Sequence, residues 1–199
     1  MEELTRLIRS DMRPALGVTE PGAIAFAAAK ARSYTSGEVI SVTVKLNSGM
    51  YKNAFTCGIP NSREVGSEFA AALGAIAGNE ELGLESLSDV KQKDAERAEK
   101  LVKQGKVQVI LQDISSRIFI EVEVKTKLDQ AVVTIEDTHT NITGIVVNGE
   151  VRFANSKEKT KGGEAEENRK FTGIHFGSYA SMQILQMCRN WNLYGRHIV

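Results

Sequence analysis

The residues of this sequence best placed for chemistry are Thr19, Glu20 and Pro21, which stand directly before an apolar run. Threonine is a common helix cap, and glutamate and proline suit the first turn of a helix. Ala23 to Ala29 offer no polar side chain, so the helix that follows must be buried. Its N terminus therefore directs free backbone N–H groups into the interior or a cleft, where a carboxylate or other anion can bind. The alternative is a capped core helix without a ligand.

The cysteines and histidines show no pattern that would hold a metal. Cys57 and Cys188 are the only cysteines, and they lie too far apart in the sequence to suggest a disulfide framework or a metal site. His139, His175 and His197 have no ligand spacing either. We therefore expect free, reduced thiols and no metal ligands.

Composition excludes several classes of partner. The 199 residues contain 25 Lys plus Arg and 25 Asp plus Glu, so no excess of one sign suggests a nucleic acid or an anionic membrane. No apolar run is long enough to cross a bilayer. The chain opens Met-Glu-Glu-Leu, acidic where a secretory signal would be basic. We expect a cytoplasmic protein that binds neither nucleic acid nor membrane.

Periodicity predicts helices and one hairpin in the first half of the chain. Alternating residues predict a strand at 39–46, and the Asn47-Ser48-Gly49 turn suggests that 50–57 returns as its hairpin partner. A helix is expected at 65–77, with small residues that let a second element approach closely. The charged segment 88–105 is expected to form a helix with a solvated face, with the pairs Glu96–Lys100 and Glu99–Lys103 on its surface.

After residue 107 the period changes to two, which predicts several short strands. Asn148-Gly149 is the strongest local hairpin signal. Helices that precede a run of strands favour an α+β fold, with N-terminal helices on one face of a mainly antiparallel sheet. We expect one α+β domain at 1–154, a charged linker or loop at 155–170 and an aromatic-rich, possibly helical tail at 171–199.

Several motifs, in order, carry a resemblance to a known family. They are RPALGVTEPGAIAFAAAKA, MYKNAF, FAAALGAIAGNEELGLESL and DTHTNITGIVVNGE. From Arg13 to Phe153 the chain resembles the N-terminal half of the serine dehydratase alpha-chain-like family that includes L-cysteine desulfidase. The resemblance implies a cytoplasmic bacterial or archaeal lyase that uses a [4Fe–4S] cluster to eliminate water or hydrogen sulfide from an amino acid, leaving pyruvate and ammonia.

Two departures from that family bear on activity. Where the family reads G-C-T-E-P, this chain has Val18, which can neither ionise nor bind iron. The family is about twice as long, and its cluster-binding cysteines lie in the C-terminal half. We therefore expect no catalytic residue and no cluster in this chain, and a truncated or frame-shifted member whose tail from about Phe171 is not ancestral.

The resemblance also carries candidate substrate-binding residues onto this sequence. They are Thr19, Glu20, Asn53, His139, Thr140 and Asn141. The two asparagines can bond an amino acid's polar groups, His139 can titrate near neutral pH, and Glu20 can orient an ammonium. Each has a structural alternative: a helix cap for Glu20, and an ordinary strand-connecting turn for His139 and Asn141.

Two hypotheses follow. In the first, the chain descends from the iron–sulfur amino acid lyases, keeps part of the pocket for a small amino acid, and needs the missing C-terminal half on another polypeptide for activity. In the second, it is a non-catalytic module that binds a small carboxylate or assembles with a partner. A homodimer fits either one, because half of a larger fold leaves apolar surface uncovered.

Overall fold

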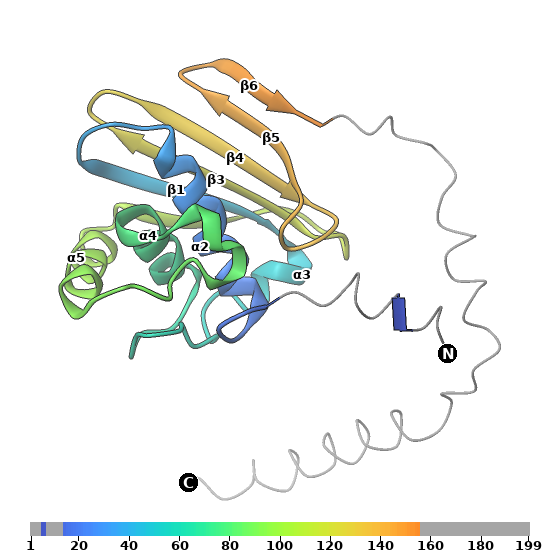
Figure 1. Cartoon of the computed structure of the whole chain (residues 1–199), viewed down its shortest axis with the longest axis horizontal. Coiled ribbons are helices and arrows are strands. Elements are labelled where there is room, and N and C mark those ends of the chain that lie inside the picture. The colour runs from blue at the N-terminus through green and yellow to red at the C-terminus, as the bar shows by residue number, and fades with distance from the viewer. Residues whose placement is uncertain (1–4, 7–13, 156–199) are drawn as a thin grey trace, which may run out of the picture. The chain divides into compact units, whose positions relative to one another are not determined.

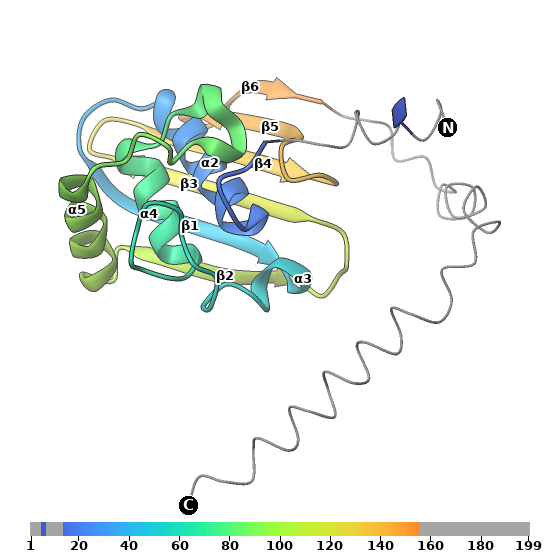
Figure 2. The same ribbon diagram turned by 60° about the horizontal axis from the view of Figure 1, so that its bottom comes forward.

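The computed structural model describes residues 5–6 and 14–155, and within 14–155 a layer of helices covers a six-stranded sheet (Figures 1 and 2). In chain order the elements are α2 (Thr19–Ser33), β1 (Val39–Asn47), α3 (Ser48–Tyr51), α4 (Ser67–Ala77), the 3-10 helix η1 (Glu80–Glu85), α5 (Gln92–Lys103), β2 (Val107–Asp113), β3 (Phe119–Thr126), β4 (Gln130–Glu136), β5 (Ile142–Val147) and β6 (Glu150–Ala154). The predicted α+β class is confirmed. Apart from Asn155, the expected linker at 155–170 and tail at 171–199 lie outside the described residues.

The sheet runs in the order β2-β1-β3-β4-β5-β6 and is mainly antiparallel, as predicted, with one parallel pair between β1 and β2. Alternate residues such as Val44, Val122 and Val133 are fully buried on one face. Their neighbours on the other face, among them Thr43 and Glu121, are only half-buried. Since side chains alternate between the faces of a strand, the buried face is the one that the described helices cover. Helices α2 and α4 pack on it, and α5 packs against α4 on the same side (Figures 1 and 2).

Asn148 and Gly149 form the predicted tight hairpin turn between β5 and β6. Their φ angles are 52° and 84°, and Val147 pairs directly with Glu150 across the turn. Two consecutive residues with positive φ are what a two-residue hairpin needs to match the twist of its strands. The local prediction is therefore confirmed.

The predicted hairpin between 39–46 and 50–57 is wrong. Residues 48–51 form the single helical turn α3, and β1 pairs instead with β2 in parallel, with Val44 opposite Val109. The reason is the environment of Asn47, whose side chain is fully buried and therefore cannot sit at an exposed turn. Parallel strands need a long crossover, and α3, α4, η1 and α5 supply it.

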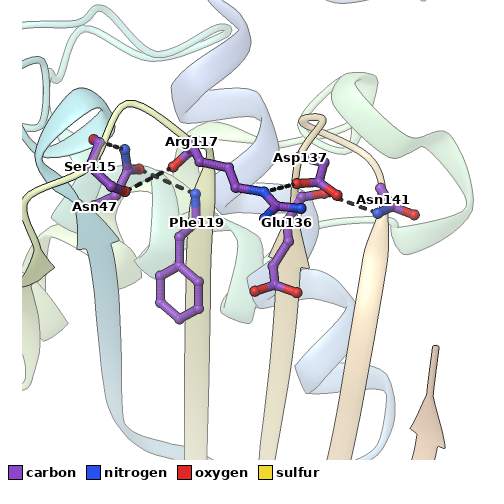
Figure 3. A network of polar contacts seen from close by, with 7 residues as sticks. All are labelled: Asn47, Ser115, Arg117, Phe119, Glu136, Asp137 and Asn141. Atoms are coloured by element: carbon purple, nitrogen blue, oxygen red, sulfur yellow. Dashed lines mark hydrogen bonds and ion pairs between the residues drawn. The ribbon is translucent and has the colours of Figure 1, made fainter. Parts of the chain in front are cut away.

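Asn47 ties the end of β1 to the segment that enters β3 (Figure 3). Its Nδ2 donates to the Ser115 carbonyl oxygen at 2.8 Å, and its Oδ1 accepts from the Phe119 amide at 3.2 Å. Ser48 Oγ also donates to the Ser115 oxygen, at 3.1 Å. Because a buried amide must have partners, these bonds fix where β3 begins.

The core depends on a close approach between α2 and α4. Every residue of α2 from Pro21 to Ala29 is buried, as the sequence predicted. Gly74 of α4 faces Ala25 of α2 so closely that a Cβ at Gly74 would lie 2.8 Å from Ala25 Cα, and nearer still to the Ala25 carbonyl oxygen. The small residues of the predicted 65–77 helix thus serve the close contact that the sequence analysis expected.

Helix α5 is the charged helix predicted at 88–105, and it buries only Ala98 and Leu101. Its predicted Glu99–Lys103 ion pair forms, with 2.5 Å between the charged atoms. The predicted Glu96–Lys100 pair is not among the ion pairs of the described residues. None of the helices in the described part of the chain is both long and apolar enough to cross a membrane.

Replacing Gly74 with alanine tests the contact between α2 and α4, because two effects predict changes of opposite sign in the free energy of unfolding. Helix propensity alone would stabilise the protein by about 1 kcal/mol. The clash with the backbone at Ala25 should instead destabilise it by about 2 kcal/mol or more. Urea unfolding measures the difference, and Gly58→Ala, where the new Cβ meets nothing within 4 Å, should change stability by less than about 0.5 kcal/mol. A stabilised Gly74→Ala protein would refute the packing argument.

Replacing Asn47 with alanine should destabilise the fold by about 2–4 kcal/mol, because it removes two hydrogen bonds and leaves the Phe119 amide without its partner. The matched control is Ser48→Ala, which removes only the second bond to the Ser115 oxygen and should cost about 1 kcal/mol or less. Urea midpoints for the two variants give the comparison. Equal losses would contradict the role assigned to Asn47.

Candidate functional site

No side chain of residues 14–155 caps the N terminus of α2, which leaves its backbone donors to a ligand. Val18 occupies the N-cap position with φ −65° and ψ 129°, and it makes no side-chain bond to the helix. The prediction that Thr19 caps the helix is wrong, since Thr19 is already the first helical residue. The cause lies in Pro21 and Gly22: proline has no N–H to offer a cap, and the Gly22 amide bonds the Val18 carbonyl oxygen at 3.4 Å.

Two backbone donors remain at this terminus. The amides of Thr19 and Glu20 precede the first intrahelical bond, and neither has a hydrogen-bond acceptor among the described residues. Both residues are half-buried, whereas the Val18 side chain is 44% exposed. The helix dipole adds partial positive charge at the same place. The terminus can therefore accept an anionic group from the solvent side.

The structure brings Glu20 and Asn53, two predicted site residues, into direct contact. Asn53 lies in the turns after α3, and its Nδ2 donates to Glu20 Oε1 at 2.9 Å. Both side chains are only partly buried. The bond holds the carboxylate on the first turn of α2 and leaves its second oxygen available to another donor.

His139 belongs to the same electrostatic environment. Burial lowers the pKa of His139 below its ordinary value, and the negative charge of Glu20 opposes that shift. The imidazole is therefore mainly neutral at neutral pH, when it can either donate or accept a hydrogen bond. The structure thus gathers Glu20, Asn53 and His139 from α2, the segment after α3 and the β4–β5 turn.

Cys57 joins this group, although the sequence predicts only a free, reduced thiol there. Burial raises the pKa of the Cys57 thiol, and the Glu20 carboxylate raises it further. The residue is half-buried and keeps its proton at neutral pH. No pattern in the sequence marks it, because Asn53 and Cys57 lie outside the helices and strands, where spacing does not predict contact. We name Glu20, Asn53, Cys57 and His139 the Glu20 cluster.

Asn141 and Thr140, the other predicted site residues, lie in the turn that carries His139. Asn141 Nδ2 donates to the Glu136 carbonyl oxygen at 3.0 Å (Figure 3). The backbone amide of Asn141 donates to the Thr138 carbonyl oxygen at 3.3 Å. The neighbouring Asp137 accepts a bond from Arg117. Asn141 therefore closes the turn, and a ligand-binding role for its side chain and for Thr140 stays a prediction.

Within the described residues the donors do not fit an iron–sulfur cluster. No three His, Cys, Asp or Glu side chains converge there as a metal site would require. Cys57 is the single cysteine of that part of the chain, and a [4Fe–4S] cluster is held by cysteine thiolates. The arrangement of charges instead suits a small polar molecule.

The fold and the cluster together define an α+β domain in which the first turn of a buried helix carries a carboxylate that bonds an amide and acts on the charge of an imidazole. Comparison with known proteins shows that the chain is similar to proteins named UPF0597 protein from Clostridium botulinum. That name specifies no activity, so the expected affiliation with the serine dehydratase-like lyases stays a prediction.

A relative from strain Langeland is 33% identical over 160 residues, which cover 80% of this chain and 37% of the relative. A second from that strain is 33% identical over 173 residues, covering 85% of this chain and 40% of the relative. One from strain Hall is 32% identical over the same length. The chain thus spans about two fifths of the length of the curated relatives it matches. No family model and no solved structure matches it.

Replacing Glu20 with glutamine should lower the pKa of His139 further, because the carboxylate charge that opposes the effect of burial is removed. The pKa of Cys57 should fall as well, since Glu20 raises it. NMR titration of the imidazole, assigned with a His139→Gln protein, measures the first shift. Glu68→Gln is the matched control, since Glu68 also stands in the first turn of a helix.

The lowered pKa of His139 in the wild-type protein also makes the stability of the fold depend on pH. Since the folded pKa of His139 lies below the unfolded one, the unfolded chain binds the proton more readily, and stability is lost as pH falls through about 6.5. Glu20→Gln should enlarge this loss. An unchanged pKa of His139 in the variant would show that the carboxylate does not act on the imidazole.

Proposed function

We propose that this chain is part of a relative of the iron–sulfur-dependent L-serine dehydratases and L-cysteine desulfidases, that it recognises a small amino acid at the Glu20 cluster, and that it does not carry out the elimination alone. The observation that carries the proposal is the hydrogen bond between Asn53 Nδ2 and Glu20 Oε1 at the uncapped N terminus of α2. This contact joins two segments that the family resemblance had selected separately.

An amino acid fits this terminus because it carries both charges. The free amides of Thr19 and Glu20, with the helix dipole, suit its carboxylate. The Glu20 side chain, oriented by Asn53, suits its ammonium. His139, neutral because it is partly buried, can bond a side-chain hydroxyl or thiol. Serine and cysteine are the smallest amino acids with such a group.

The lack of elimination follows from the state of the thiols. The family's reactive cysteine corresponds to Val18, which stands at the N-cap, where a helix terminus would favour a thiolate. Cys57 does not substitute for it, because burial and Glu20 both hold its proton in place. Since the donors of the described residues do not fit a [4Fe–4S] cluster, no step through that cluster is assigned to them.

The proposal includes a setting for the chain. We place it in the cytoplasm, where reduced thiols persist, and expect it to act beside a polypeptide that supplies the cluster-binding half, or as a homodimer. Each of the two curated relatives from strain Langeland is more than twice as long as the region that matches this chain.

Calorimetry with the full chain tests the amino acid site. L-Serine should bind more tightly than L-lactate, which lacks the ammonium, and than ethanolamine, which lacks the carboxylate. Glu20→Gln should lower the affinity for L-serine about tenfold, because a charge-assisted hydrogen bond contributes about 1.5 kcal/mol or more. The affinity for L-lactate should be nearly unchanged. Glu68→Gln, which removes a carboxylate from the first turn of α4, is the matched control and should bind like the wild type.

The outcomes separate the two hypotheses. Equal binding of serine and lactate would overturn the amino acid proposal in favour of a carboxylate-binding module. Absence of binding together with firm dimerisation in sedimentation would favour an assembly role. In a second arm, anaerobic reconstitution with iron and sulfide should give no pyruvate from serine or cysteine, and turnover would refute the inactivity proposed here.

A further inference from the structure

The opposite end of α2 carries a second charged feature, a cleft of about 300 Å³. Arg32, in the last turn of α2, lines it together with Arg97 and Lys100 of α5 and with Lys106 just before β2. We name these four residues the basic cleft. Arg32 lies twelve positions beyond Glu20, or about 18 Å along a helix, so the cleft is distinct from the Glu20 cluster.

The charges that line the cleft do not balance. Glu38 is the one carboxylate among its lining residues. The last turns of α2, α4 and α5 also reach it, and each helix C terminus is equivalent to about half a negative charge. These negative contributions leave a surplus of about 1.5 positive charges. Cations that merely offset the helix dipoles would not leave such a surplus.

Arg32 is held in place for binding. Its Nη1 donates to the Thr35 carbonyl oxygen at 2.5 Å and to Thr35 Oγ1 at 2.9 Å, and its Nη2 donates to the Gly37 carbonyl oxygen at 2.8 Å. A guanidinium has five N–H donors, so two remain for a ligand. Because its acceptors are neutral, the guanidinium keeps its full charge, and it loses little entropy on binding.

The other three cations are available to a ligand. Lys100 and Lys106 make no ion pair with a carboxylate in the described part of the chain. Arg97 reaches Asp94 only at 3.7 Å, with a side chain that is 63% exposed. The apolar side chains of Ile76 and Leu101 form part of the wall between the charges. The cleft therefore combines three exposed cations, one guanidinium held by hydrogen bonds, and an apolar surface.

From these features we propose that the basic cleft binds a small phosphate monoester. A phosphate dianion matches a surplus of about 1.5 charges better than a single carboxylate does, and arginine bonds phosphate oxygens in pairs. The volume leaves room for a few carbon atoms beside the phosphate, against Ile76 and Leu101. The proposal does not depend on the amino acid site, because different residues form each.

Titration of the full chain with inorganic phosphate, glycerol 3-phosphate and acetate tests the proposal. Glycerol 3-phosphate should bind saturably at millimolar concentration or below and more tightly than inorganic phosphate, whereas acetate should not saturate. Lys100→Gln should lower the affinity for glycerol 3-phosphate about tenfold, since the substitution removes a charged hydrogen-bond donor. Lys103→Gln changes the same charge on the same helix but lies outside the cleft, and it should have less than about a twofold effect.

A second readout keeps the test independent of any variant. In the wild-type chain, NMR shifts on addition of glycerol 3-phosphate should concentrate at Arg32, Lys100 and Gln104 and leave Glu20 unaffected. Equal weakening by Lys100→Gln and Lys103→Gln would overturn the proposal, as would inorganic phosphate binding as tightly as the ester. Absence of saturation by any phosphate would overturn it as well.

Discussion

The structure depends on one constraint, the burial of a helix that has no polar face. Helix α2 satisfies it by packing on β3 and β4 of the sheet and against α4 and η1 at its sides, where Gly74 lets the backbones of α2 and α4 approach closely. Such a helix cannot rotate to expose one side, because no side tolerates water better than another. Only its ends can reach the surface. The two candidate sites accordingly lie at the two ends of α2.

The two ends differ in a way that the helix dipole explains only in part. A carboxylate at the N terminus and an arginine at the C terminus both complement the dipole. Glu20 and Arg32 alone would be enough to complement the helix dipole. At the first end, however, an amide, a thiol and an imidazole join Glu20, and at the second end three more cations join Arg32. Because these additional groups are not needed to complement the dipole, they are the basis for proposing a ligand at each end of the helix.

Sequence reasoning succeeded where local chemistry decides the structure and failed where distant contacts do. The burial of α2, the small face of α4 and the Asn148-Gly149 turn follow from residues next to one another. The hairpin prediction failed because Asn47 is a turn former by type but bonds Ser115 and Phe119, about seventy positions away. Likewise Thr19 resembles a cap, yet Pro21 moved the helix start by one residue.

The candidate site shows the same division. Motif resemblance selected Glu20, Asn53 and His139 without indicating that they meet, and it passed over Cys57, because a thiol with a raised pKa leaves no mark on the sequence. This division bears on function as well. Recognition of an amino acid needs only the charges that gather at the N terminus of α2, whereas elimination needs a thiolate, and Val18 offers none. Because different atoms serve the two tasks, a domain can keep the first after losing the second.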